Sequence, residues 1–342
     1  MPSLSKTAGI LYGAEGCEVG RKAELAGFSR KYMPQNYAVI DIGTLKVKLL
    51  IARVLASGQI EEIYSSNTLT CFGCDMDKNQ GYVFEENLQK TIEEIKRCKG
   101  IIEKYNVSKT RIVSTHAMRR AKNKEEILNK ILAETGFLVE NISQEEEAVL
   151  FFSAVARGFK DFKENHAVID VGGGSVQILI GNENGISSTH TMQTGAQYLH
   201  DNFTEDSSNP ESFTTEEDIE KMKHYILKQL FPVEKSQGVS IVYGSSNIID
   251  LMKAIRLPLE SSLVSASHPY KTYSKYLSGF VREVLPLKYC EREAKYPFQK
   301  GYMWGIDKAF LNVVEISKHL ESTYIIPSNA NIAKGIIYSR LA

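Results

Sequence analysis

The sequence lacks an excess of charge of either sign and lacks any long apolar run. Its 342 residues include 41 basic and 41 acidic side chains, and this balance argues against a general electrostatic surface for nucleic acid. No apolar stretch approaches the ~18 residues that a membrane-spanning helix needs. Residues 1–33 also lack the apolar core of a secretory signal. We therefore expect a cytoplasmic protein that binds neither nucleic acid nor membrane.

Cysteine is scarce as well, with five in the chain, and we expect them to be reduced in the cytoplasm. Two of them belong to the sequence Cys71-Phe72-Gly73-Cys74, a spacing found in halves of zinc sites and in redox pairs. The chain has no second pair of this kind, and no histidine stands at ligand spacing from it. Two ordinary buried thiols are therefore the preferred interpretation, and a metal or redox function is the alternative.

What the sequence does contain is a six-residue motif, here called the repeated motif, that appears twice. Residues 38–43, AVIDIG, recur as residues 167–172, AVIDVG. The apolar residues predict a strand buried on both faces, in which Asp41 or Asp170 is costly to bury unless it meets a cation or hydrogen-bond donors. The glycine that follows permits a tight turn. Two such hairpins, each with a carboxylate at its tip, indicate two related lobes that face each other across a phosphate-binding cleft.

Strands and helices alternate within each half of the chain, which is typical of an α/β protein, and the length suffices for two domains. Residues 1–36 show no amphipathic pattern, and we expect a poorly ordered extension there. The first lobe is expected at 37–165 and the second, with helical insertions, at 166–328. Residues 261–319 have mainly helical patterns. A closing helix at 329–342 is a candidate to pack back on the first lobe.

The second copy of the repeated motif continues into Gly173, Gly174 and Ser175. Successive glycines expose backbone N–H groups that can form a nest for phosphate oxygens, and the serine adds a hydroxyl donor. A flexible hairpin turn is the alternative interpretation. The matching aspartate at Asp41 favours a phosphate site, because two carboxylate-tipped turns can hold Mg²⁺ between them.

Charged side chains are predicted beside these turns. Lys46, Arg119, Arg120 and Lys122 supply positive charge near the strand ends, and arginine can bind phosphate through two parallel hydrogen bonds. For Arg120 and Lys122 a solvated helix face is the preferred interpretation. Glu147 is the last of three glutamates that begin a helix, and it directly precedes an apolar run, so we expect it to be drawn toward the interior. A partly buried glutamate has a raised proton affinity and can act as a general base.

Taken together, these segments resemble the exopolyphosphatase / guanosine-pentaphosphate phosphatase (Ppx/GppA) family of the actin–Hsp70–sugar-kinase superfamily. The resemblance spans about residues 37–340 and weakens after residue 255. It rests on five segments in the family's order, namely the Asp41 hairpin, 114–123, 142–148, 170–175 and the turn after Val242. It implies an α/β fold of two ribonuclease-H-like (actin-like ATPase) lobes, with mixed sheets flanked by helices and the active site in the interlobe cleft.

The resemblance also implies roles for single residues. Glu147 would prepare the attacking water, and Arg119 would bind the anion. Asp41 and Asp170 would hold Mg²⁺ or another divalent cation. Phosphates would be held by the glycine-rich turns, here Gly43, Thr44, Gly172, Gly173, Gly174, Ser175, Gly244 and Ser245.

Three turns depart from the family pattern. Where the family has Gly-Gly-Gly-Ser-Thr-Glu, this chain has GGGSVQ, so the amide of Gln177 replaces an acid that helps to hold water or metal in the family. We keep Gln177 among the catalytic candidates. The first turn has Thr-Leu-Lys in place of Ser-Asn-Ser. The third has Ser245-Ser246 where the family has two glycines, and serines restrict the backbone around a phosphate.

The leading hypothesis is a Mg²⁺-dependent hydrolase that releases terminal phosphate from inorganic polyphosphate or the 5′ phosphate from guanosine pentaphosphate. Its activity is expected to be weakened by Gln177. The first alternative is a sensor of the same fold that binds nucleotide or polyphosphate without hydrolysing it. The second is an ATP-dependent kinase, for which Gly244-Ser245-Ser246 makes a poor adenosine loop. The choice between the two substrates and the possibility of a homodimer stay open.

Overall fold

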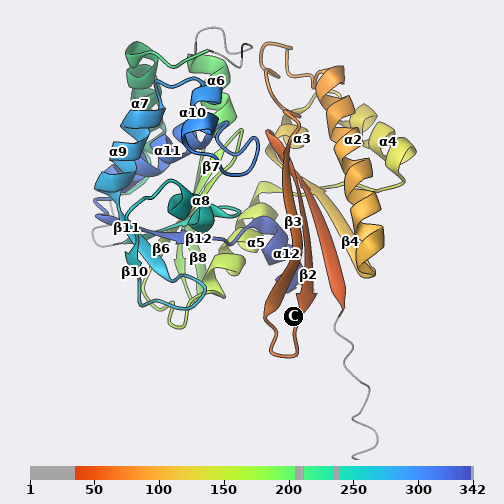
Figure 1. Ribbon diagram of the computed structural model, residues 1–342, viewed down its shortest axis with the longest axis horizontal. Helices are drawn as coiled ribbons and strands as arrows, with labels where there is room; N and C mark the ends of the chain where they lie inside the picture. The colour runs from red at the N-terminus through yellow and green to blue at the C-terminus, as the bar shows by residue number, and fades with distance from the viewer. Residues whose placement is uncertain (1–34, 205–208, 210–211, 235–238, 340–342) are drawn as a thin grey trace, which may run out of the picture.

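The computed structural model describes residues 35–204, 209, 212–234 and 239–339. They form two halves, each a mixed sheet flanked by helices (Figure 1), so the predicted α/β fold with two lobes is confirmed. Of the expected extension, 1–36, all but the last two residues lie outside the described part. None of the described helices is long and apolar enough to span a membrane.

The first lobe is built on a five-stranded sheet with the strand order β3-β2-β1-β4-β5. Its strands are β1 (Asn36–Ile42), β2 (Lys46–Val54), β3 (Ile60–Leu69), β4 (Val107–Ser114) and β5 (Glu140–Asn141). The helical segments that follow the strands are α2 (Glu85–Ile102), η1 (Glu103–Tyr105), α3 (His116–Arg120) and α4 (Lys124–Thr135). One face of the sheet is covered by α2 and α4, whose apolar side chains pack with those of β1 and β2.

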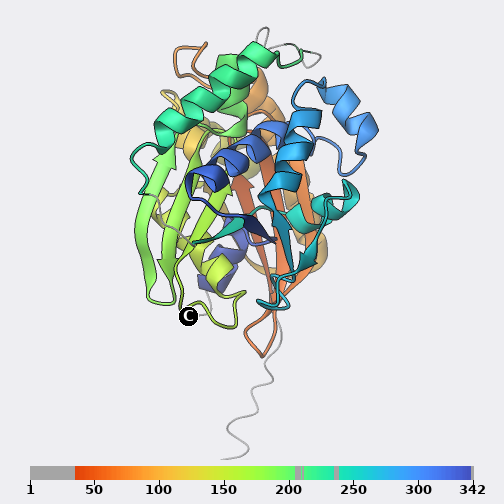
Figure 2. The same cartoon turned by 90° about the vertical axis from the view of Figure 1, so that its left-hand side faces the viewer.

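The second lobe contains a seven-stranded sheet with the order β10-β11-β12-β9-β6-β7-β8. Its strands are β6 (His166–Val171), β7 (Val176–Asn182), β8 (Gly185–Met192), β9 (Ser240–Gly244), β10 (Glu260–Ser261), β11 (Tyr270–Tyr273) and β12 (Tyr324–Ser328). Its helices are α6 (Ala196–Phe203), α7 (Glu216–Leu230), α8 (Ile248–Ala254), α9 (Ser274–Val284), α10 (Tyr289–Lys295) and α11 (Ile306–His319). Figure 2 shows α7 and α11 lying across one face of this sheet, where they bury the apolar side chains of β6 and β7.

The duplication seen in the sequence is a duplication of topology. In the first lobe β1 pairs antiparallel with β2 and parallel with β4. In the second lobe β6 pairs antiparallel with β7 and parallel with β9. Asp41 and Asp170 therefore occupy equivalent positions near the carboxyl ends of the two central strands. Both predicted hairpins are present, and each turn follows its aspartate at the same edge of its sheet.

Two helices fill the space between the lobes. They are α5 (Gln144–Ala156) and α12 (Ile332–Ser339), which pack against each other at the centre of Figure 1. Helix α12 packs on β1 and β2, and α5 packs on β6 and β7. A Cβ atom at Gly335 would lie 2.0 Å from the carbonyl oxygen of Leu150. Glycine is therefore what allows these two helices to approach so closely.

The expectation that residues 261–319 are mainly helical is wrong at its start. Strand β11 lies in this region and pairs antiparallel with β12, with Thr272 opposite Ile325. Strand β10 in turn pairs with β11. A four-residue strand is too short to show a clear period of two, and its pairing partner lies far along the chain.

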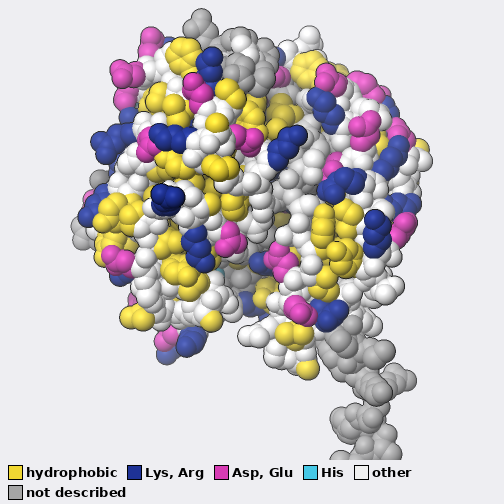
Figure 3. All heavy atoms as spheres, in the orientation of Figure 1, with side chains coloured by type: hydrophobic (Ala, Val, Ile, Leu, Met, Phe, Trp, Pro, Cys, Tyr) yellow, Lys and Arg dark blue, Asp and Glu magenta, His cyan; other side chains and the backbone are white. Residues whose placement is uncertain are grey.

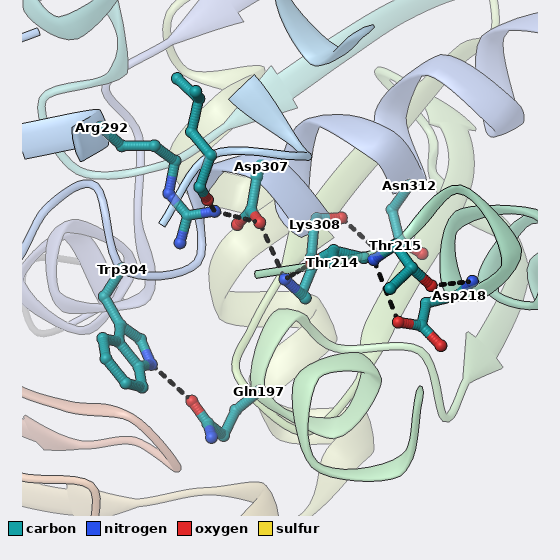
Figure 4. Close-up of polar contacts among 10 residues, drawn as sticks. Gln197, Thr214, Thr215, Asp218, Arg292, Trp304, Asp307, Lys308 and Asn312 are labelled. Carbon is teal, nitrogen blue, oxygen red and sulfur yellow. Dashed lines mark hydrogen bonds and ion pairs between the residues drawn. The ribbon is translucent and has the colours of Figure 1, made fainter. Parts of the chain in front are cut away.

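A buried charge cluster stabilises the outer part of the second lobe (Figure 4). The carboxylate oxygen Oδ2 of Asp307 lies 2.7 Å from Nη1 of Arg292 and 2.8 Å from Nζ of Lys308. Burial alone would raise the pKa of Asp307, but the two cations lower it to about 2. Asp307 is therefore ionised, and it partly neutralises two cations that are themselves removed from water.

Candidate active site

A cavity of about 140 Å³ lies between the two lobes. The sequence-predicted residues that line it are Asp41, Gly43, Thr44, Glu147, Asp170, Gly172, Gly173, Gly174, Ser175, Gly244 and Ser245. They come from the ends of β1, β6 and β9 and from the first turn of α5. On the outside, basic and acidic side chains are interspersed over the face shown in Figure 3. Inside the cleft, Lys46 and Lys48 supply positive charge beside the three carboxyl groups of the lining.

The two glycine-containing turns have the same internal hydrogen bond. In the first, the N–H of Gly43 donates to the carbonyl of Lys46 at 3.0 Å. In the second, the N–H of Gly172 donates to the carbonyl of Ser175 at 2.9 Å. The turns also touch across the cleft, because a Cβ atom on Gly173 would lie only 3.0 Å from the Cβ of Thr44. Glycine at this position allows the two lobes to close on each other.

The two aspartates share a lysine. Nζ of Lys48 lies 3.5 Å from Oδ2 of Asp41, and the attraction of Asp41 and Asp170 raises the pKa of Lys48 although burial opposes this. Burial raises the pKa of Asp170 to about 6, with Lys48 acting in the opposite direction. Oδ1 of Asp41 is buried and has no hydrogen-bond partner. An unpartnered carboxylate oxygen facing a cavity is a place for a cation or a donor.

Glu147 is placed by the start of α5. The hydroxyl of Ser143 accepts a hydrogen bond from the N–H of Glu146 at 3.1 Å and so caps the helix. Nη2 of Arg119 lies 2.8 Å from Oε2 of Glu147, and Nη1 of Arg119 donates to the carbonyl of Ile142 at 3.1 Å. Burial raises the pKa of Glu147 to about 7, with Arg119 opposing the shift and Asp170 adding to it. A carboxyl group that is half deprotonated near pH 7 is suited to accept a proton.

Four of the charged or polar residues singled out in the sequence lie apart from the cavity wall. The side chain of Arg119 is held by Glu147. Arg120 pairs with Asp77, and Nζ of Lys122 lies over the ring of Tyr82. Gln177 stands directly opposite Asp170 in the β6–β7 pair, is 3% exposed and has no partner for its Oε1. It is not among the residues that line the cavity.

The structure adds residues that sequence reasoning did not assign to the site. His116 lines the cavity, and its Cδ2 would lie 2.2 Å from a Cβ atom on Gly174. Burial lowers the pKa of His116 to about 4, and its Nε2 has no partner, so this ring is a neutral polar group in the cleft. Tyr302 also lines the cavity, and its ring centroid lies 4.7 Å from Nζ of Lys46. The signal for His116 was its place in the 114–123 segment, but nothing local showed that it crosses to the other lobe.

The residues present fit a magnesium ion that is shared with a phosphate. Mg²⁺ is usually held by one or two carboxylates together with substrate phosphate oxygens and water. Asp41 and Asp170 provide two carboxylates, and one of their oxygens is unpartnered. Within the described ranges, no group of three or more histidine, cysteine, aspartate or glutamate side chains is arranged to hold a metal. The donor set therefore suits an ion that arrives with its phosphate and does not form a closed protein cage.

The third turn is held in place by neighbouring elements. The N–H of Ser245 donates to the carbonyl of Ser328 at 3.0 Å. The hydroxyl of Tyr302 donates to the carbonyl of Ser246. A Cβ atom on Gly244 would lie 2.4 Å from Cζ of Phe151, so the end of β9 packs directly on α5. The serines that replace the family's glycines thus stand in a turn that is fixed by hydrogen bonds.

The chain is thus a two-lobed α/β protein whose glycine-rich turns line one cavity with a buried glutamate. The chain belongs to the Ppx/GppA phosphatase family, whose model matches residues 51–342. The matched part begins after the first turn, which is one of the turns that departs from the family pattern. The resemblance seen in the sequence is thereby confirmed.

Solved structures share the fold. The Ppx/GppA family member from Aquifex aeolicus is 24% identical with a TM-score of 0.69, covering 90% of this chain and 98% of that one. An exopolyphosphatase from Cytophaga hutchinsonii is 23% identical with a TM-score of 0.75 and the same coverage of 90% and 98%.

A curated relative is similar in sequence. It is a bifunctional 3-dehydroquinate synthase/phosphatase from Fusobacterium nucleatum, 33% identical over 214 residues, or 59% of this chain. The matched part spans 32% of that relative's length.

Proposed function

We propose that this chain hydrolyses phosphoanhydride bonds and releases terminal phosphate from inorganic polyphosphate or guanosine pentaphosphate. Membership of the Ppx/GppA family supports a phosphatase-type function. The observation that carries the proposal is the position of Glu147, which lines the same cavity as both glycine-containing turns and has a pKa raised to about 7. The attack of water on phosphorus requires at least a general base and a group that binds the phosphate, and here these are Glu147 and the neighbouring backbone N–H groups.

Positioning and charge neutralisation provide most of the rate in phosphoryl transfer. Backbone N–H groups of Gly173 and Gly174 bind phosphate oxygens, and the ammonium groups of Lys46 and Lys48 offset their charge. Glu147 orients a water molecule and takes its proton. Arg119 fixes the Glu147 carboxylate through the 2.8 Å ion pair, which makes it a positioning residue in this proposal.

Asp41 and Asp170 would hold a divalent cation, most simply Mg²⁺. The ion would supply further neutralisation of the phosphate charge when bound. Lys48 already pairs with Asp41 and is attracted by Asp170. We therefore expect the ion to bind more tightly in the presence of a polyphosphate than in its absence.

The second candidate function is a sensor that binds the polyanion without cleaving it. The observation that favours it is Gln177, whose amide stands beside Asp170 where the family resemblance implies an acid. In this case the cavity would bind its ligand, and the lobes would close on it, without turnover.

Phosphate release from long-chain polyphosphate and from guanosine pentaphosphate, measured side by side with Mg²⁺, tests the proposal. Release from either substrate that is abolished in Glu147→Gln supports a hydrolase. Glu146→Gln is a matched control, because Glu146 is on the same helix turn but pairs with Arg111 outside the cavity. Binding of tripolyphosphate without release from either substrate would instead identify a sensor.

A further inference from the structure

The sequence Cys71-Phe72-Gly73-Cys74 forms a tight turn directly after β3. The N–H of Cys74 donates to the carbonyl of Cys71 at 3.0 Å, which closes a β-turn and brings their Cα atoms within about 7 Å of each other. Disulfides bridge Cα atoms at about 4.4–6.8 Å. Both cysteines are free thiols, and each thiol is close enough to shift the pKa of the other. The pair is therefore within reach of a disulfide with only small movement.

The two thiols are not equivalent. The hydrogen bond from Cys74 lowers the pKa of Cys71, which is partly exposed. Burial, and then the same hydrogen bond, raise the pKa of Cys74 well above its ordinary value. In thiol–disulfide exchange, the more accessible thiol with the lower pKa attacks first and its neighbour resolves the mixed disulfide. By both its exposure and its lower pKa, Cys71 is the attacking thiol of the pair, and Cys74 is the resolving thiol.

This turn supports the first phosphate turn of the cleft. The N–H groups of Thr70 and Cys71 both donate to the carbonyl of Leu45, at 3.1 and 3.0 Å. The N–H of Gly73 donates to the carbonyl of Thr44 at 2.8 Å. Three hydrogen bonds from this short segment thus fix the backbone of two cavity residues, Thr44 and Leu45. A change in the conformation of this turn therefore moves the carbonyl groups of Thr44 and Leu45, and with them the backbone of the first phosphate turn.

Packing leaves the turn little room to move independently. A Cβ atom on Gly73 would lie 2.6 Å from the Cβ of Ala117 and 2.9 Å from Cγ2 of Thr44. On its other side the N–H of Asp75 donates to Oδ2 of Asp201 at 3.0 Å, and Asp201 belongs to α6 of the second lobe. The dithiol turn therefore touches both the phosphate turn and the opposite lobe.

We propose that Cys71 and Cys74 form a reversible disulfide, with a low-molecular-weight disulfide as oxidant, and that this modification weakens polyanion binding in the cleft. The Cys71 thiolate attacks one sulfur of the oxidant RSSR, forming Cys71–S–SR and releasing RS⁻. The Cys74 thiol then loses its proton and attacks the Cys71 sulfur, forming the intramolecular bond and releasing the second RS⁻. The two cysteine thiols together lose two electrons and two protons, and RSSR takes them up to become two RSH.

The experiment treats the full chain with glutathione disulfide and then with dithiothreitol. Mass spectrometry of peptides under non-reducing conditions is expected to show a Cys71–Cys74 link that dithiothreitol removes. Calorimetric titration with tripolyphosphate is expected to show affinity that falls at least about fivefold on oxidation, a modest allosteric coupling, and returns on reduction. Cys71→Ser and Cys74→Ser are each expected to keep the reduced-state affinity and to lose the response.

Cys290→Ser is the matched control, since Cys290 is an exposed cysteine on α10 in the second lobe, and this variant should respond as the parent does. Absence of the Cys71–Cys74 link overturns the modification site. A link with unchanged tripolyphosphate affinity overturns the coupling to the cleft.

The effect on the cleft rests on the proposed function, whereas the mass measurement does not. If the reduced protein binds no tripolyphosphate, the proposed function and the coupling both fail, and the disulfide is still judged by mass.

Discussion

The guanidinium of Arg119 lies 2.8 Å from the carboxylate of Glu147, and these residues come from different helices of the first half of the chain. The pair joins α3 to α5 at the edge of the interlobe cavity. Because Glu147 is buried, its pKa rises to about 7 despite this cation. The balance between burial and Arg119 is thus what sets the proton affinity of the proposed base.

Replacement of Glu147 by glutamine keeps the size and hydrogen bonding of the side chain but removes its ability to take a proton. We expect phosphate release to fall by about 10²–10⁴-fold. Tripolyphosphate binding should be retained, because the turns that hold phosphate are unchanged. Steady-state kinetics with calorimetric binding checks both statements. Release at the parental rate would show that Glu147 is not the base.

The rate of phosphate release should depend on the protonation of Glu147. A base must be deprotonated to act, so we expect kcat/KM to rise with pH through about 7 and then to level off. The groups that influence this carboxyl are Arg119, which lowers its pKa, and Asp170 and Asp41, which raise it. Arg119→Met should therefore move the rising limb to higher pH. A profile that is flat between pH 5.5 and 8.5 (a window about 1.5 pH units either side) would contradict the assignment.

Conversion of Gln177 to glutamate places a second carboxyl group opposite Asp170 on the same face of the sheet. An amide is neutral, whereas a carboxylate behind the cavity wall adds negative charge next to Asp170 and so strengthens the attraction for a cation. We expect Gln177→Glu to raise turnover, most clearly at limiting Mg²⁺. A Mg²⁺ titration of phosphate release for both proteins measures this. Unchanged or lower turnover at every concentration would mean that Gln177 does not limit the site.

Gly173 is expected to tolerate no side chain. A Cβ atom there would lie 3.0 Å from Cβ of Thr44 and 3.1 Å from Cβ of Leu45, so Gly173→Ala pushes the phosphate turns apart. At these distances the neighbours must shift by a few tenths of an ångström; since a misplacement of about 1 Å can reduce a rate by about 10²-fold, we expect a smaller loss than that. Gly279→Ala is the control, because a Cβ atom at this helical position meets nothing within 4 Å. That control should keep full activity.

The buried cluster around Asp307 is expected to be needed for the stability of the chain. Asp307→Asn leaves Arg292 and Lys308 without their shared anion (Figure 4). Breaking a buried ion pair in this way destabilises a protein by about 3–5 kcal/mol. Urea unfolding followed by circular dichroism measures the change. Glu86→Gln breaks an exposed pair with Lys90 and should change stability by less than about 0.5 kcal/mol, so equal effects in the two variants would contradict the prediction.

Sequence patterns were sufficient for the architecture near the site. The repeated motif at residues 38–43 and 167–172 predicted two equivalent hairpins. The structure has these hairpins as β1–β2 and β6–β7. The short strands β10 and β11 were not foreseen, because strands of two and four residues show no reliable period, and because β11 is stabilised by pairing with β12 from a distant part of the chain.

The sequence by itself determined where each carboxylate and each glycine stands at the end of a strand, because burial patterns and turn chemistry are local. Only the tertiary structure decided how these groups act on one another. It brought Lys48 close enough to feel the charge of both Asp41 and Asp170, set His116 against Gly174 of the other lobe, and left Gln177 behind the cavity wall. The physical reason is that electrostatic interaction and desolvation depend on distance and burial in space, and neither can be read from separation along the chain.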